Sequence, residues 1–134
     1  MHAWQIVWRR GIAPSLSTAA LTALRDGLES DDRALIQGGT TNPPPLECLK
    51  DCPVTAACPL SYAGWKGDGL ATVGEVEEYF ARLCARADEA LGEPAAIRHF
   101  LNHVDDVERA TMRAELLAEV ALALGARQQA APAA

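Results

Sequence analysis

Residues 72–92 read TVGEVEEYFARLCARADEALG, and this stretch carries the clearest structural signals in the chain. Thr72 and Glu75 have the spacing of a capping box, in which the hydroxyl accepts the Glu75 amide and the carboxylate reaches back to residue 72. A glycine such as Gly92 is typical of a helix end. The apolar residues between these points recur at helical spacing and predict one buried face: Val73, Val76, Phe80, Leu83, Cys84, Ala87 and Leu91. The stretch therefore predicts a long amphipathic helix.

Helical signals also appear before and after this stretch. Ser17 is the expected N-cap of a helix that reaches Glu29. Residues 31–37 are expected to form a short helical turn. A further helix is expected over residues 93–104, and a last one ends at Gly125. The buried face of the 93–104 helix is expected to hold Ile97, Phe100, Leu101 and Val104.

The middle of the chain, residues 40–69, carries turn signals: three consecutive prolines, two Cys-Pro pairs and several glycines. Elsewhere the apolar content is mostly Ala and Leu, which favour helix, and aromatic residues make up only 5% of the chain. The predicted fold is therefore all-α, a small bundle of about four to five helices with a long, ordered Pro/Gly/Cys-rich loop packed against it. We expect one helical domain over residues 1–127 and a flexible C-terminal tail over residues 128–134.

Charge and hydropathy narrow the classes of partner. A net charge of −6 argues against a general nucleic-acid binder, because phosphate contact needs a basic surface. No apolar run approaches the length of a membrane span, and the first eight residues lack the pattern of a signal peptide. We therefore expect a cytoplasmic protein with reduced thiols that binds neither nucleic acid nor membrane.

Three cysteines, Cys48, Cys52 and Cys58, lie within a dozen residues of one another. The first two have the Cys-x3-Cys spacing of a zinc-binding pair, but the third follows at a gap typical of neither zinc nor iron–sulfur sites. Cys84 falls on the apolar stripe of the 72–92 helix, where a free cysteine acts as a small hydrophobe. Packing is the favoured interpretation, without a cofactor. A zinc or redox site is the alternative.

A second candidate metal site is the pair His99 and His103, which are four residues apart on an expected helix. This spacing can place two imidazoles on one ion, as in zinc proteases, but the general-base glutamate of that motif is missing. Both histidines are expected opposite the apolar face, exposed to solvent. A solvated face is therefore the favoured interpretation, and a metal ligand pair is the alternative.

The N-terminal segment concentrates Trp4, Trp8, Arg9 and Arg10. We expect it to lie across the bundle and complete the core, or else to act as a partner-binding arm, because tryptophan and arginine are enriched in interface hot spots. Trp65, in a glycine-rich turn, is expected to plug the loop onto the helices, with a capped pocket as the alternative. Near the start of the last helix, two arginines, Arg109 and Arg113, are expected to pair with Asp105 or Asp106.

No motif ties the chain to a characterised family, and no nucleophile elbow, phosphate loop or dinucleotide fingerprint is present. The leading hypothesis is a small helical interaction or accessory protein without catalytic activity, which binds a protein partner or self-associates. The first alternative is a metal- or redox-binding module at Cys48, Cys52 and Cys58. The second is a small enzyme or ligand-binding protein, with a pocket under residues 60–70 near Trp65, Lys66 and Asp68.

Overall fold

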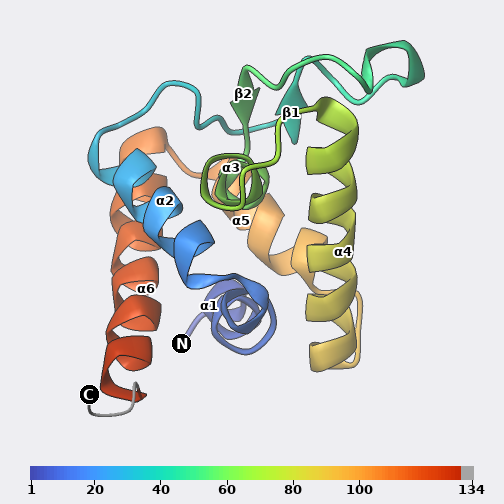
Figure 1. Cartoon of the computed structure of the whole chain (residues 1–134). Coiled ribbons are helices and arrows are strands. Elements are labelled where there is room, and N and C mark those ends of the chain that lie inside the picture. The colour runs from blue at the N-terminus through green and yellow to red at the C-terminus, as the bar shows by residue number, and fades with distance from the viewer. Residues whose placement is uncertain (131–134) are drawn as a thin grey trace.

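The long helix α4 (Val73–Leu91) forms one side of the molecule in the computed structural model, which describes residues 1–130 (Figure 1). Both capping-box bonds are present: the Thr72 hydroxyl accepts the Glu75 amide at 3.3 Å, and the Glu75 carboxylate accepts the Thr72 amide at 3.1 Å. Gly92 ends the helix with φ 73°. The predicted helix and its buried face are confirmed at Val73, Val76, Leu83, Cys84 and Ala87.

The described residues are mostly helical, as the composition predicts, with one small two-stranded sheet. The α-helices besides α4 are α1 (Ala3–Val7), α2 (Thr18–Glu29), α3 (Pro59–Tyr62), α5 (Asn102–Asp106) and α6 (Arg109–Ala130). Short π-helical turns are η1 (Trp8–Ile12), η4 (Ala63–Gly67) and η5 (Ala96–Leu101), and 3₁₀ turns are η2 (Ala13–Ser15) and η3 (Glu47–Leu49). The strands are β1 (Thr41–Asn42) and β2 (Ala56–Ala57).

Helices α2 and α6 run antiparallel along the side of the molecule opposite α4 (Figure 1). Ser17 caps α2 as predicted, since its hydroxyl accepts the Ala20 amide at 2.9 Å. The predicted end of the last helix at Gly125 is wrong, because α6 continues through this residue to Ala130. A glycine inside a helix costs only about 1 kcal/mol, which packing against α2 outweighs. Of the expected tail, residues 128–130 are helical and residues 131–134 lie outside the described residues.

The centre of the molecule is occupied by α3 and η4, which pack against α2 and α4 (Figure 1). The turn signals of residues 40–69 allow short helical turns after Pro45 and Pro53, and η3 follows Pro45, but the buried helix at residues 59–67 is not predicted by them. Pro59 stands at the first helical position, where a missing N–H costs nothing. Gly64 allows close packing, since a Cβ there would lie 2.6 Å from the ring of Tyr79. Here the prolines and glycines start and pack a buried helix.

The remaining loop is held at its base by contacts to α4. Strand β1 pairs antiparallel with β2, a small sheet that the all-α prediction does not include. The Glu77 carboxylate accepts hydrogen bonds from the hydroxyls of Thr40 and Thr41, at 2.5 and 2.9 Å. Beyond this base the loop projects from the body of the molecule (Figure 1). Of the helical turn expected over residues 31–37, a single hydrogen-bonded turn is present, in which the amide of Leu35 donates to the carbonyl of Asp32 at 3.0 Å. The chain then becomes extended, because Leu35 forms a bridge with Ala57.

The chain after α4 also departs from a regular helix. In η5, the amide of Asn102 donates to the carbonyl of Ile97, five residues earlier. A π-helical turn changes the angular position of the residues that follow. As a result Ile97 is 59% exposed and the prediction of its burial is wrong, whereas burial of Phe100, Leu101 and Val104 is confirmed.

One cluster of buried side chains connects these elements, from Trp4 near the start of the chain to Val120 in α6. Within residues 1–130, no helix combines the length and the apolar character needed to cross a membrane.

Candidate functional site

The N-terminal segment lies in the core. Trp4 is 5% exposed and Trp8 is fully buried, with its ring stacked on Phe100 at a centroid distance of 5.6 Å. The expectation that this segment completes the core is therefore confirmed for the two tryptophans, and the alternative, in which their rings contact a partner, is corrected. Burial of an indole removes a large apolar area from water, and α1 and η1 provide that burial.

The two arginines that follow have different environments. Arg9 donates from Nε and Nη2 to the two carboxylate oxygens of Glu119, each at 2.7 Å. Glu119 is only 4% exposed, and its hydrogen bonds with Arg9 lower the pKa of its carboxyl group. Arg10 is exposed and makes no side-chain hydrogen bond or ion pair within residues 1–130. The structure therefore leaves Arg10 available on the surface and uses Arg9 to neutralise a buried charge.

The cysteines have unlike surroundings. Cys48 is exposed in the projecting loop, Cys52 is half-buried, and Cys58 and Cys84 are buried. Burial raises the pKa of the Cys58 thiol and raises that of Cys84 to about 12. Within residues 1–130, no group of three or more His, Cys, Asp or Glu side chains is placed to hold a metal ion. The metal or redox site at Cys48, Cys52 and Cys58 thus remains a prediction without a supporting contact.

The two histidines do not face solvent together. The ring of His103 stacks in parallel on Trp4 at 4.8 Å, and its Nε2 lies 3.1 Å from the Glu115 carboxylate. His99 lies 3.7 Å from a carboxylate oxygen of Glu93. Their side chains are 28% and 32% exposed, so the expectation of a solvated face is corrected. The π turn η5, which the sequence pattern does not reveal, sets these positions.

In the 60–70 segment, the side chains of Trp65, Lys66 and Asp68 contact other residues of the protein. Trp65 is half-buried against the core and meets the ring of Tyr62 edge-on at 6.0 Å, in the position of a plug. Lys66 Nζ lies 4.1 Å above the ring of Trp65. Asp68 accepts a hydrogen bond from the hydroxyl of Ser17 at 2.6 Å. A pocket formed by Trp65, Lys66 and Asp68 remains a prediction.

Arginines of α6 instead hold the end of α2. Arg109 forms an ion pair with Asp31 at 2.8 Å and donates to the carbonyl of Leu35 at 2.7 Å. Arg113 donates to the carbonyl of Leu28 at 2.9 Å. The expected pairing with Asp105 or Asp106 is therefore wrong. Carbonyl groups at a helix C-terminus lack partners within the helix and attract cations, which explains the position of both arginines. The sequence contains no signal that α2 ends beside α6, so this pairing could not be predicted.

Hollows on the surface border the second half of α6. One, the η1–α6 groove, has a volume of about 340 Å³ and is lined by Trp8, Arg9, Ala13, Glu119, Leu122, Ala123 and Ala126. Leu122, on its edge, is 60% exposed. From residue 116 to residue 126 the only charged side chain is Glu119, which is buried and paired. This side of α6 is thus an uncharged surface beside two arginines.

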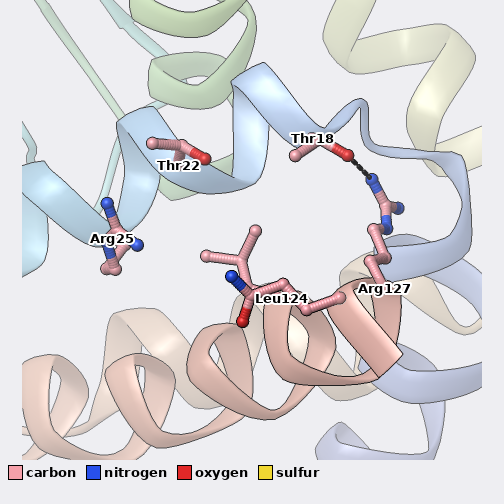
Figure 2. A pocket seen from close by; sticks show the side chains of 6 residues that line it. Thr18, Thr22, Arg25, Leu124 and Arg127 are labelled. Atoms are coloured by element: carbon pink, nitrogen blue, oxygen red, sulfur yellow. Dashed lines mark hydrogen bonds between the residues drawn. The ribbon is translucent and has the colours of Figure 1, made fainter. Parts of the chain in front are cut away.

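On its other side, α6 and α2 enclose the α2–α6 groove, of about 390 Å³, lined by Thr18, Thr22, Arg25, Leu124, Arg127 and Gln128 (Figure 2). Arg127 closes one end of this groove. It donates to Thr18 Oγ1 at 3.2 Å and to the carbonyls of Ala13 and Leu16 at 2.9 and 2.5 Å. No Asp or Glu side chain is among the lining residues. The groove therefore combines hydroxyl, amide and guanidinium groups above one leucine.

Comparison with family models, curated proteins and solved structures finds no match to this chain.

Sequence reasoning missed both grooves. The usable signal was the run of residues 116–126, which has apolar residues on all sides of the helix and one charge. A helix of this kind is normally covered on more than one face. Arg25 of α2 and Leu122 and Arg127 of α6 gave no separate signal, because the grooves they line form only where other elements pack beside α6.

Proposed function

We propose that this protein is a small helical interaction protein, without catalytic activity of its own, that binds an acidic amphipathic segment of a partner protein. The binding surface is the η1–α6 groove together with the exposed Leu122. The partner segment would lie along the outer face of α6, as an amphipathic helix does when its apolar face enters a groove.

The observation that carries this proposal is the exposure of Leu122 at the centre of an uncharged helical face. Its immediate exposed neighbours on α6 are Ala118, Ala121 and Ala126. Small side chains allow a second helix to approach closely, because the interaxial distance depends on the residues at the contact. A large apolar side chain surrounded by small ones supplies the anchor that interface hot spots require.

Charge selects the partner. Arg127 lines the hollow next to this groove, and Arg10 is exposed in η1, which borders the groove. The one carboxylate in the groove, Glu119, is 4% exposed and neutralised by Arg9. In a chain of net charge −6 this is a locally basic surface, so an acidic segment fits it and a basic one does not. We also propose a cytoplasmic location, since the exposed thiol of Cys48 fits a reducing compartment.

The proposal is tested by capture with the tagged full-length chain, followed by calorimetry with the purified partner. We expect Leu122→Asp to weaken binding about 30-fold or more, because it places a charge at the centre of the contact. Arg10→Glu should weaken binding several-fold and reduce its dependence on salt. The matched control is Leu46→Asp, which changes a leucine that is 56% exposed in the projecting loop. Equal binding by the Leu122→Asp and wild-type chains, or a basic partner segment, would contradict the proposal.

A further inference from the structure

Another hollow, the η5–α5 pocket, lies away from both grooves of α6, and nothing in the proposed function uses it. The loop at residues 38–40 lines one part of it, and η5 and α5 contribute Ile97, Leu101, Asn102 and Asp105. Its volume is about 250 Å³, slightly below the range of about 300–1,000 Å³ for drug-sized ligands. An occupant of this pocket is therefore a small molecule.

The π turn η5 places one apolar and two polar side chains in a row along this pocket. Because the amide of Asn102 donates to the carbonyl of Ile97, these two residues lie one turn apart. Asp105 follows three residues after Asn102 in α5, and residues at this spacing share one face of a helix. In a regular α-helix, Ile97 would instead lie below Phe100 and Leu101. The row from Ile97 to Asp105 therefore gives the pocket an apolar end and a polar end.

The apolar end exposes a large side chain to water. Ile97 is 59% exposed, and the pocket that it lines also includes Leu101 of η5 and Phe80 of α4, both packed against the core. The Cys58 thiol, which also lines the pocket, is buried, and burial raises its pKa, so it is uncharged at neutral pH. A hydrocarbon group in the pocket would remove part of this apolar surface from water.

The polar end carries the only charge among the lining residues, the carboxylate of Asp105. Its Oδ1 accepts the Gly38 amide at 2.9 Å, and its other oxygen has no hydrogen bond or ion pair within residues 1–130. The side-chain nitrogen of Asn102 donates to the carbonyl of Arg98 at 3.2 Å, which leaves Asn102 Oδ1 free to accept. A carboxylate in the last turn of a helix also faces the negative end of the helix dipole, and a bound cation would relieve this repulsion.

The loop beside Asp105 is held in place before any ligand binds. Gln37 Nε2 donates to the carbonyls of Val104 and Val107 at 2.7 and 2.9 Å, and the Gly38 amide fixes one carboxylate oxygen of Asp105. These bonds join the loop to the end of α5. A site that is already ordered lowers the entropy cost of binding.

We propose that the η5–α5 pocket binds a small primary aliphatic amine, with its ammonium group at Asn102 and Asp105 and its hydrocarbon chain against Ile97. An ammonium group has three donors and no acceptor, and the polar end offers free acceptor oxygens and a negative charge. An anion would meet the carboxylate with like charge, and no Lys, Arg or His side chain lines the pocket to attract it. A neutral alcohol would fill the same space without the charge interaction.

The experiment is a titration of the full ¹⁵N-labelled chain with hexylamine, butylamine, hexanol and hexanoate at pH 7 and constant ionic strength. We expect the amides of Gly38, Asn102 and Asp105 to shift together, with hexylamine binding more tightly than hexanol and hexanoate. Hexylamine should bind about tenfold more tightly than butylamine, because each buried CH₂ strengthens binding about fourfold. Ile97→Ala should reduce this difference to about threefold or less, and the exposed side chain makes the variant safe for folding.

Asp105→Asn removes the charge and keeps an oxygen that can accept the Gly38 amide. It should weaken hexylamine about fivefold, the upper range for an exposed ion pair, and leave hexanol unchanged. The matched control is Asp106→Asn, which removes the same charge from the next residue, exposed and outside the pocket lining. This variant should bind hexylamine as the wild type does, and so should Leu122→Asp, because the pocket is separate from the proposed partner surface. Equal weakening by Asp105→Asn and Asp106→Asn, unchanged affinity of Asp105→Asn, or hexanoate binding as tight as that of hexylamine would overturn the proposal.

Discussion

Glu119 carries a carboxylate that is buried against the core, where an unpaired charge is unfavourable. A carboxylate that is 4% exposed would be costly if it were unpaired, but Arg9 binds both of its oxygens and Gln5 Nε2 lies 3.4 Å from one of them. This contact joins η1 to α6 across more than a hundred residues of sequence. It also explains why one charge can stand inside the apolar run of α6.

Glu119→Gln should therefore lower the free energy of unfolding by about 1–3 kcal/mol at pH 7. The folded pKa of Glu119 lies below its usual value of 4.5, so the unfolded chain takes up a proton first as the pH falls. The stabilisation is complete above about pH 5 and is lost as the pH falls through the folded pKa. Urea unfolding at pH 7 and below pH 4 measures the effect.

The variant should lose less stability than the wild type on this acid limb, since it has no carboxyl group at position 119 to protonate. Glu78→Gln is the matched control, because Glu78 forms an exposed pair with Arg82 at 3.0 Å and should change stability by less than about 0.5 kcal/mol. If the free energy of unfolding of the Glu119→Gln and wild-type chains decreased equally between pH 7 and pH 4, the proposed role of the Glu119 carboxylate would be contradicted.

The thiols should differ in reactivity in the order of their burial. In the native protein at pH 8, Cys48 should react quickly with a thiol reagent and Cys52 more slowly. Cys58 and Cys84 should react only after unfolding, because burial raises their pKa and blocks access. The absorbance of the thiol that the reagent releases measures the rate and amplitude of each reaction phase. Cys48→Ser should remove the fast phase, and fast labelling of Cys84 in that variant would show that the core opens at α4.

At the level of elements, the sequence predicts those whose signals are local. The capping box of α4 and the Ser17 cap of α2 need only residues within one turn, and both are present. The segment formed by α3 and η4 is different, because Pro59 and the glycines of η4 suggest a turn until Tyr79 is placed against Gly64. The exposure of Ile97 follows from the π turn η5, and π turns have no reliable local signature. The grooves depend on which helices meet, which no single segment contains.

Two glycines inside helices test this distinction between local and tertiary effects. Gly125→Ala should raise the free energy of unfolding by about 0.5–1 kcal/mol, since a Cβ there meets no described atom within 4 Å and alanine favours helix. Gly27→Ala should lower it by about 1–3 kcal/mol, because the Cβ would lie 2.6 Å from the ring of Tyr62. Chemical denaturation measures both. The same sign of change for the two variants would contradict this packing.

For the molecule as a whole, the N-terminal segment is either a separate partner-binding arm or an integral part of the core. If residues 1–12 were a separate partner-binding arm, the rest would fold without them. The structure places Trp8 and Ile12 among the fully buried side chains, with η1 packed on α4. A core loses cooperativity when such a layer is removed, because the cavity cannot collapse fully.

Trp8→Ala should accordingly lower the free energy of unfolding by about 3–5 kcal/mol, and a chain that lacks residues 2–12 should show no cooperative thermal transition. Near-UV circular dichroism and calorimetry measure both effects. Arg10→Ala is the control within the same turn, and its exposed side chain should change stability by less than about 0.5 kcal/mol. An unchanged transition in the shortened chain would show that the segment is a separable arm, and the surface proposed for partner binding would then have to exclude η1.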